Sequence, residues 1–282
     1  MEHWHERMLD NLISYLEPNK DVLGLLLFGS CSKQESHCDD WSDLDILLVV
    51  KNDKLDNFFP SVGWITSFGR MYTYNQSSDD FKFVTRVCFE NFNRIDFVIT
   101  TEEKLADVDR WPSVPFFSGT KILLSRSEAV DQIASRGSFP YTLSLRTDEQ
   151  FLEMVRNFRF KSILAVYKVV RNDLLVALHL AQDLNRDCCV LGMMLRDRAT
   201  GTNIHKTGAS GNQVVALLES AQKPFTPYGI LESIKESSEI FEKLAGEWSS
   251  TDQENRQLLN WIEKAKVQLA EQKPGYPFSI SS

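Results

Sequence analysis

The sequence predicts an α+β protein: an N-terminal α/β domain with a mixed sheet of about five strands, followed by an all-α domain. Two observations lead to this fold class. Short apolar runs typical of strands follow a helical pattern in the first half, and amphipathic helical periodicity replaces them from Asp148 onward. We therefore expect domains at residues 1–143 and 144–282, joined within the stretch 138–146.

One helix opens the first domain, and strands make up most of the rest. Residues 3–16 carry leucine and isoleucine at helical spacing, and a Glu-Pro-Asn sequence then ends the helix. Residues 22–28 and 44–50 are short apolar runs, which are typical of strands buried on both faces. Three more strands are expected where β-branched and aromatic residues gather, at 66–74, 81–89 and 94–100.

The second domain is predicted to be helical throughout. Apolar residues recur with a helical period in five segments: 149–170, 174–184, 212–221, 230–244 and 255–271. The stretch 200–211, which has three glycines, forms an irregular loop between two of them and contains His205. The sequence assigns no role to His205 or to this loop.

The charge balance bears on the partners. The chain has 31 basic and 39 acidic residues, a net charge of −8, and residues 1–143 alone hold 14 basic and 22 acidic residues. Nucleic-acid binding depends on clustered Lys and Arg, so a nucleic-acid partner is not expected.

No apolar run reaches the roughly 18 residues of a membrane span, and residues 1–16 carry charges where a signal peptide is apolar. We therefore expect a cytoplasmic protein without a membrane partner.

The cysteines are odd in number, and no two of them form a Cys-x-x-Cys pair. A disulfide framework or a zinc site depends on paired spacings, so neither is indicated. We expect reduced thiols at all five positions: Cys31, Cys38, Cys88, Cys188 and Cys189.

Two carboxylates stand at the start of the predicted strand 44–50. Asp43 and Asp45 are two residues apart, so they face the same side with Cα atoms about 7 Å apart. Asp45 lies within the apolar run, where an unpaired buried carboxylate costs several kcal/mol. A metal ion removes that cost, so the pair is predicted to bind metal. The alternative is structural, with Asp43 capping the strand and Asp45 facing water.

A third carboxylate, Asp96, interrupts the apolar strand predicted at 94–100. If this strand lies beside 44–50, Asp96 completes a cluster of three oxygen donors, which suits Mg²⁺ and substrate phosphates. The alternative is a salt bridge from Asp96 to Arg94 or Arg86.

A Gly-Ser pair ends the first predicted strand. Gly29 allows the backbone to approach a phosphate closely, and Ser30 offers a hydroxyl and N–H groups. No GxxxxGK sequence follows, so this is not a Walker A loop.

These elements occur in a fixed order: an apolar strand ending in Gly29-Ser30, a loop of twelve residues, Asp43-x-Asp45 in a strand, and Asp96 in a later strand. In this order and spacing they resemble the DNA polymerase β-like nucleotidyltransferase superfamily.

Two further stretches narrow the resemblance. Residues 62–69 (Val-Gly-Trp-Ile-Thr-Ser-Phe-Gly) and, more loosely, residues 165–178 are similar to the aminoglycoside 6-adenylyltransferases that modify streptomycin. The chain departs from that pattern at Cys31 and Arg70, where these enzymes commonly have Arg and Glu.

The resemblance implies a magnesium-dependent transfer of a nucleoside monophosphate, AMP from ATP, to a hydroxyl group of a small cationic acceptor. The implied acceptor is an aminoglycoside such as streptomycin, and pyrophosphate is released. Two Mg²⁺ ions would be held by Asp43, Asp45 and Asp96 in a site between the domains, with Asp96 or another carboxylate as the base. The remaining implied site residues are Gly29, Ser30, Ser42 and Lys168 for the nucleotide, and Trp64 and Asp173 for the acceptor.

Several assignments have competing interpretations. Lys168 can belong to a solvated helix face, Asp173 can cap the helix that starts at Leu174, and Trp64 can be a core residue. For the reaction, the alternatives are a lincosamide or another metabolite as acceptor, or nucleotidylation of a protein or a tRNA. The alternative of another class is a nucleotide-binding module without catalysis. The base preference and the oligomeric state stay open.

Overall fold

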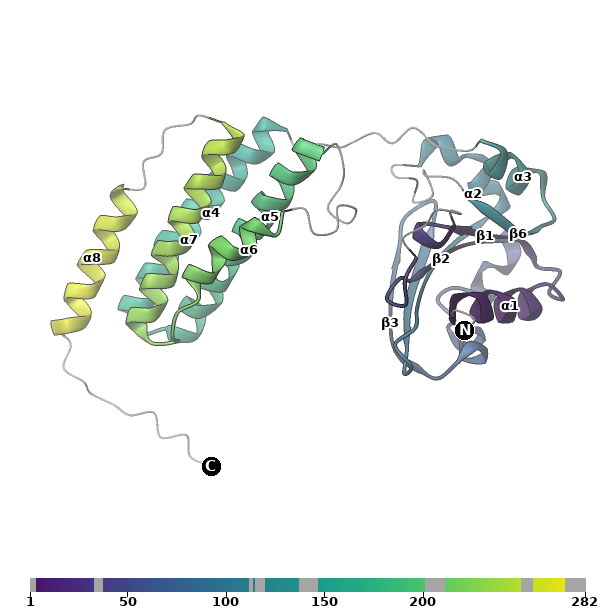
Figure 1. Cartoon of the computed structure of the whole chain (residues 1–282), viewed down its shortest axis with the longest axis horizontal. Helices are drawn as coiled ribbons and strands as arrows, with labels where there is room; N and C mark the ends of the chain where they lie inside the picture. The colour runs from purple at the N-terminus through teal and green to yellow at the C-terminus, as the bar shows by residue number, and fades with distance from the viewer. Residues whose placement is uncertain are drawn as a thin grey trace, which may run out of the picture. The chain divides into compact units, whose positions relative to one another are not determined.

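The computed structural model describes residues 4–32, 38–111, 114, 120–136, 147–200, 211–249 and 256–271. The chain divides into two compact units, Met1–Thr142 and Leu143–Ser282, each with hydrophobic core clusters of its own (Figure 1). The predicted α+β class, a mixed sheet followed by helices, is confirmed. The expected linker at 138–146 and His205 of the loop 200–211 lie outside the described residues.

A mixed sheet in the order β3-β4-β5-β2-β1-β6 forms the first unit. β2 and β5 run parallel, and every other neighbouring pair is antiparallel. The strands are β1 (Val22–Phe28), β2 (Leu44–Val50), β3 (Met71–Ser78), β4 (Phe83–Phe89), β5 (Arg94–Thr101) and β6 (Lys121–Ser125). β6 was not expected, because this short edge strand lacks the continuous apolar run of a central strand.

Helices cover both faces of the sheet, as the apolar runs of β1 and β2 predict (Figure 1). On one face, α1 (Trp4–Leu16) packs Met8, Leu12 and Leu16 into the core. On the other face, α2 (Glu102–Ala106) and α3 (Glu128–Ser135) contribute their apolar residues to a second cluster. Burial on both faces fixes the central strands, and with them the carboxylate of Asp45, which lies in β2.

The strand predicted at 66–74 begins later than expected. Gly63–Phe68 form a 3-10 helix that buries Trp64 and Ile65, and β3 starts only at Met71. Between them Gly69 has a φ of 152°. Aromatic and β-branched residues pack as well from a turn as from a strand, so composition alone does not separate the two.

The second unit is helical, as predicted. Its helices are α4 (Asp148–Val170), α5 (Leu174–Thr200), α6 (Gln213–Leu218), α7 (Pro227–Trp248) and α8 (Arg256–Glu271). α4 begins with a capping box formed by Thr147 and Gln150, and the stacked rings of Phe158 and Phe241 join it to α7. α5 continues past the predicted end at Leu184 to Thr200. None of the described helices combines the length and the apolar character needed to cross a membrane.

Candidate active site

The three predicted carboxylates lie together in the first unit. The parallel pairing of β2 with β5 makes Asp45 and Asp96 direct Cα partners, and Asp43 immediately precedes β2. One oxygen atom of each carboxylate lies within 4.8 Å of the others. The condition set by the sequence, that the strand of Asp96 lies beside that of Asp45, is therefore met.

The Gly-Ser turn adjoins this cluster. Phe28, the last residue of β1, pairs with Asp45 across the sheet, and Gly29 follows it with a φ of 74°. A Cβ atom at Gly29 would collide with Oδ2 of Asp45. Position 29 thus requires glycine for two reasons: its backbone is left-handed, and the Asp45 carboxylate approaches it closely.

Two arginines contact the cluster. Arg94 forms an ion pair with Oδ2 of Asp43, and its Nε lies 3.5 Å from Oδ1 of Asp96. Arg86 places its Nε 3.1 Å from Oδ2 of Asp96. The salt bridges proposed from the sequence as an alternative for Asp96 are thus present alongside the carboxylate cluster.

The carboxyl group of Asp96 is largely buried, and its pKa is shifted. Burial raises the pKa of its carboxyl group above the ordinary value, the neighbouring Asp43 adds to this, and Arg94 and Arg86 oppose it. Its Oδ1 is buried and accepts no hydrogen bond from any described residue. A buried oxygen without a hydrogen bond, beside two more carboxylates, fits a hard divalent cation such as Mg²⁺.

The two predicted serines are held by their own loops. The Ser42 hydroxyl donates to Oδ1 of Asp39 at 2.9 Å, which closes a turn just before Asp43. The Ser30 hydroxyl lies 3.9 Å from Sγ of Cys31. Nucleotide binding by either serine stays a prediction.

One expectation for the cysteines is wrong. Cys31 and Cys38 form a disulfide, whereas Cys88, Cys188 and Cys189 are free. The loop brings the Cα atoms of Cys31 and Cys38 to 5.0 Å although the residues are seven positions apart, so their spacing resembles no common motif.

Trp64 lies in the core of the first unit. Its side chain is 9% exposed, and its Nε1 donates to the carbonyl oxygen of Phe58 at 3.1 Å. Its ring meets the ring of Phe97 edge to face, with centroids 4.9 Å apart, and Phe97 directly follows Asp96. This arrangement favours the core interpretation, in which Trp64 supports β5 from behind the carboxylates.

The other two predicted ligands lie in the second unit and bind each other. Nζ of Lys168, near the end of α4, is 2.7 Å from Oδ2 of Asp173, just before α5. Both side chains remain partly exposed, so both stay available as proposed ligands.

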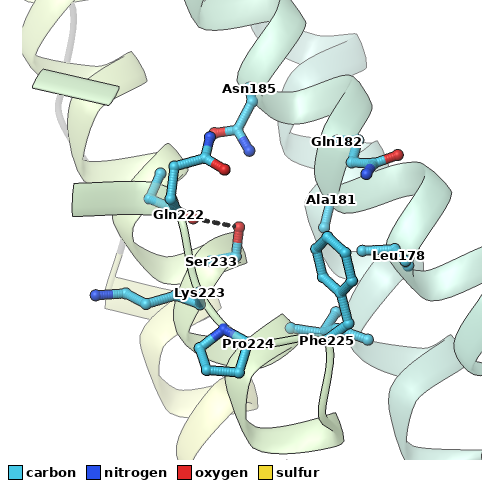
Figure 2. Close-up of a pocket in the computed structure, with 12 residues that line it drawn as sticks. Leu178, Ala181, Gln182, Asn185, Gln222, Lys223, Pro224, Phe225 and Ser233 are labelled. Atoms are coloured by element: carbon cyan, nitrogen blue, oxygen red, sulfur yellow. Dashed lines mark hydrogen bonds between the residues drawn. The ribbon is translucent and has the colours of Figure 1, made fainter. Parts of the chain in front are cut away.

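The second unit also has an open cavity of about 250 Å³ beside α5 and α7 (Figure 2). Figure 2 shows the ring of Phe225 beside Ala181 and Leu178, and the amides of Asn185 and Gln222 close together. No residue predicted from the sequence lines this cavity, and it is smaller than most small-molecule sites, which measure about 300–1,000 Å³.

From the sequence, Arg94 is predicted only as a possible partner of Asp96, although the two residues share one face of β5 by their spacing of two. His5, which lies beside Cys31 and Cys38, is not among the residues predicted from the sequence. No local signal links His5, at the start of α1, to the cysteines, because the rest of α1 and all of β1 lie between them along the chain.

A family model described as streptomycin adenylyltransferase matches residues 3–211, which is 209 of the 282 residues. An aminoglycoside 6-adenyltransferase from Bacillus subtilis is 14% identical, with a TM-score of 0.41 and coverage of 92% of this chain and 97% of that chain. A spectinomycin adenyltransferase, AAD(9), from Enterococcus faecialis, solved with ATP and spectinomycin, is 14% identical, with a TM-score of 0.31 and coverage of 94% and 99%. No curated protein matches the sequence.

Proposed function

Because the chain belongs to the streptomycin adenylyltransferase family and is a nucleotidyltransferase, we propose that it transfers AMP from ATP to a hydroxyl group of an aminoglycoside such as streptomycin, releasing pyrophosphate. The observation that carries this proposal is the cluster of Asp43, Asp45 and Asp96 beside the Gly29 turn. A protein that only binds a nucleotide has no need of three clustered carboxylates, so we favour catalysis over a binding module.

The three carboxylates are the proposed ligands of Mg²⁺, with two ions expected. When bound, Mg²⁺ neutralises phosphate charge and stabilises the leaving pyrophosphate. Gly29, which has no side chain, lets the backbone of its turn lie against the triphosphate, and Ser30 and Ser42 are proposed to donate to it. Arg94 holds Asp43 and Asp96 in the free protein, and its charge becomes available to a phosphate when the carboxylates take up their ligands.

Proton removal from the acceptor hydroxyl is assigned to Asp96. Arg86 holds Oδ2, whereas Oδ1 accepts no hydrogen bond from the described residues. In the protein without metal, burial raises the pKa of the Asp96 carboxyl group, so this carboxylate binds a proton more strongly than an exposed one does. We propose that Asp96 takes the proton through a carboxylate oxygen that no metal ion occupies, as the acceptor oxygen attacks the α-phosphorus in line with the departing pyrophosphate.

The acceptor is proposed from charge. Residues 1–143 have 14 basic and 22 acidic residues, so a polycationic aminoglycoside is attracted to this unit, and a nucleic acid is repelled. Lys168 is the proposed contact to the triphosphate and Asp173 the proposed contact to the cationic acceptor, which replace their mutual ion pair when substrates bind. We place the reaction in the cytoplasm, where ATP and Mg²⁺ are supplied.

A substrate screen tests this proposal. The purified chain is incubated with Mg²⁺, one of ATP, GTP, CTP or UTP, and one of several aminoglycosides or lincosamides, while pyrophosphate release and product mass are measured. We expect release with ATP and streptomycin, with the mass of one AMP added to the drug. Modification of a lincosamide alone would show that the acceptor is a lincosamide, with nucleotidyl transfer still the reaction. No pyrophosphate from any pair would contradict the proposed function.

A further inference from the structure

A second group of metal-binding atoms lies in the first unit, apart from the carboxylates. One ring nitrogen of His5 and the Sγ atoms of Cys31 and Cys38 lie within 4.8 Å of one another. They come from the start of α1, the turn after β1, and the loop that leads to Asp43. We propose that these three side chains form a Zn²⁺ site when the Cys31–Cys38 disulfide is reduced.

The ring of His5 makes a hydrogen bond of the kind that metal-binding histidines usually make. It is 5% exposed, and its Nε2 lies 2.9 Å from the carbonyl oxygen of Ser42. A carbonyl oxygen only accepts hydrogen bonds, so Nε2 carries the proton and Nδ1 presents the lone pair. A backbone carbonyl commonly fixes the tautomer of a zinc ligand in this way. The ring of Trp4, stacked on His5 with centroids 3.8 Å apart, restrains the imidazole further.

The two cysteines supply the softer ligands. Their Cα atoms are 5.0 Å apart, which allows both reduced side chains to reach one ion with Zn–S bonds of about 2.3 Å. Two thiolates and one imidazole are ligands that Zn²⁺ prefers, and the described residues leave a fourth position for water. The carboxylates of Asp43, Asp45 and Asp96 offer only oxygen, so the two groups select different metals by ligand type.

Zinc binding and the disulfide exclude each other chemically. Two molecules of a monothiol such as glutathione break the S–S bond, giving two protein thiols and one glutathione disulfide. Zn²⁺ then replaces the proton of each thiol, so two protons are released per ion bound. The same two side chains therefore form the disulfide when oxidised and bind the metal when reduced.

The position of this site links it to the catalytic loops. Cys31 directly follows Ser30, and its Sγ lies 3.6 Å from the carbonyl oxygen of Asp43. Cys38 lies between Cys31 and Asp43 in the sequence, seven residues after Cys31. A bound ion holds together the two segments that carry Ser30 and Asp43, as the disulfide does in the oxidised chain.

Cobalt titration of the full chain tests the site directly. The chain is reduced with a phosphine, kept free of oxygen, and titrated with Co²⁺ in excess Mg²⁺, which competes for the carboxylates. We expect a sulfur-to-cobalt charge-transfer absorption that saturates at about one ion per chain and is displaced by Zn²⁺. Cys31→Ser and Cys38→Ser should lose this absorption, and His5→Gln should bind Co²⁺ about tenfold or more weakly. Cys189→Ser, which alters an exposed free cysteine, is the matched control and should keep it.

Two further measurements guard against misfolded variants. In the unaltered chain, Zn²⁺ should protect Cys31 and Cys38 from alkylation, measured by peptide mass, while Cys189 reacts equally with and without the ion. Asp45→Asn should bind Co²⁺ like the unaltered chain, whether or not it transfers AMP, which separates this site from the proposed function. Absence of the charge-transfer absorption, its persistence in Cys38→Ser, or equal alkylation with and without Zn²⁺ would overturn the proposal.

Discussion

Asp45 of β2 and Asp96 of β5 are Cα partners on neighbouring parallel strands, so their carboxylates extend from one face of the sheet. Asp43 joins them from the residue before β2, and Gly29 lies against Asp45 from the end of β1. The relationship depends on strand register, because a shift of one residue would turn one carboxylate to the opposite face.

The first prediction concerns the contact between Gly29 and Asp45. Gly29→Ala places a Cβ in the space of the Asp45 carboxylate at a φ of 74°. We expect the free energy of unfolding to fall by about 1–2 kcal/mol and nucleotidyl transfer to fall further, because Asp45 must move. Gly63→Ala is the matched control, because a Cβ there meets no atom within 4 Å. Wild-type stability and turnover in Gly29→Ala would contradict this account of the turn.

Much of the fold and the core of the site could be predicted from the sequence. The bounds of β1 and β2 match the apolar runs, because strands buried on both faces leave a continuous signal. The pairing of Asp45 with Asp96 was stated only as a condition, since no local pattern determines which strands are neighbours. β6 and the disulfide of Cys31 with Cys38 were not predicted for a related reason. β6 depends on pairing with the distant strand β1, and the disulfide depends on the path of a loop.

The second prediction separates a nucleotide contact from an ion pair. If Lys168 binds the triphosphate, Lys168→Ala should weaken ATP binding by about 1.5–3 kcal/mol, measured by calorimetry, since a charge-assisted hydrogen bond is lost. Asp173→Asn weakens the same 2.7 Å ion pair but keeps the lysine, so it should bind ATP with near wild-type affinity. Equal losses of ATP affinity in both variants would show that Lys168 acts only through its ion pair with Asp173 and does not contact the triphosphate.

The third prediction concerns the ion pair between α7 and α8. Nζ of Lys266 lies 2.7 Å from Glu232, and this hydrogen bond lowers the pKa of the Glu232 carboxyl group. A lowered acid pKa stabilises the fold above the unfolded pKa of about 4.3, and that stability is lost as pH falls through the folded pKa. Lys266→Met should therefore lower the free energy of unfolding by about 0.2–1 kcal/mol at pH 7, because the pair is partly exposed.

Urea unfolding at a series of pH values measures this effect. The difference between Lys266→Met and the unaltered chain should shrink as pH falls below the unfolded pKa of Glu232. Lys264→Met, at an exposed position of the same helix, is the matched control and should show no such pH dependence. A constant difference across the pH range would show that Glu232 is not the partner that matters.

The fourth prediction concerns the acceptor. The net charge of −8 lies within residues 1–143, so a polycationic acceptor is attracted over a distance that salt shortens, with a Debye length of about 10 Å at 0.1 M. For an aminoglycoside, kcat/KM should fall between low and moderate salt while kcat changes less. A lincosamide, with at most one positive charge, should show a shallow dependence. An aminoglycoside reaction without salt dependence would remove charge as the basis of acceptor recognition.

The central claim is that Asp43, Asp45 and Asp96 carry out nucleotidyl transfer, and one isotope measurement tests it most directly. ATP labelled at the α-phosphorus is incubated with Mg²⁺, streptomycin and either the unaltered chain or Asp45→Asn, and the label is followed. The label should appear on streptomycin with the unaltered chain and fall by about three orders of magnitude with Asp45→Asn, which loses several kcal/mol of transition-state stabilisation. In a metal-free buffer Asp45→Asn should be at least as stable as the unaltered chain, because a charge is removed from a like-charge cluster. Transfer at a near-normal rate by a folded Asp45→Asn would contradict the claim.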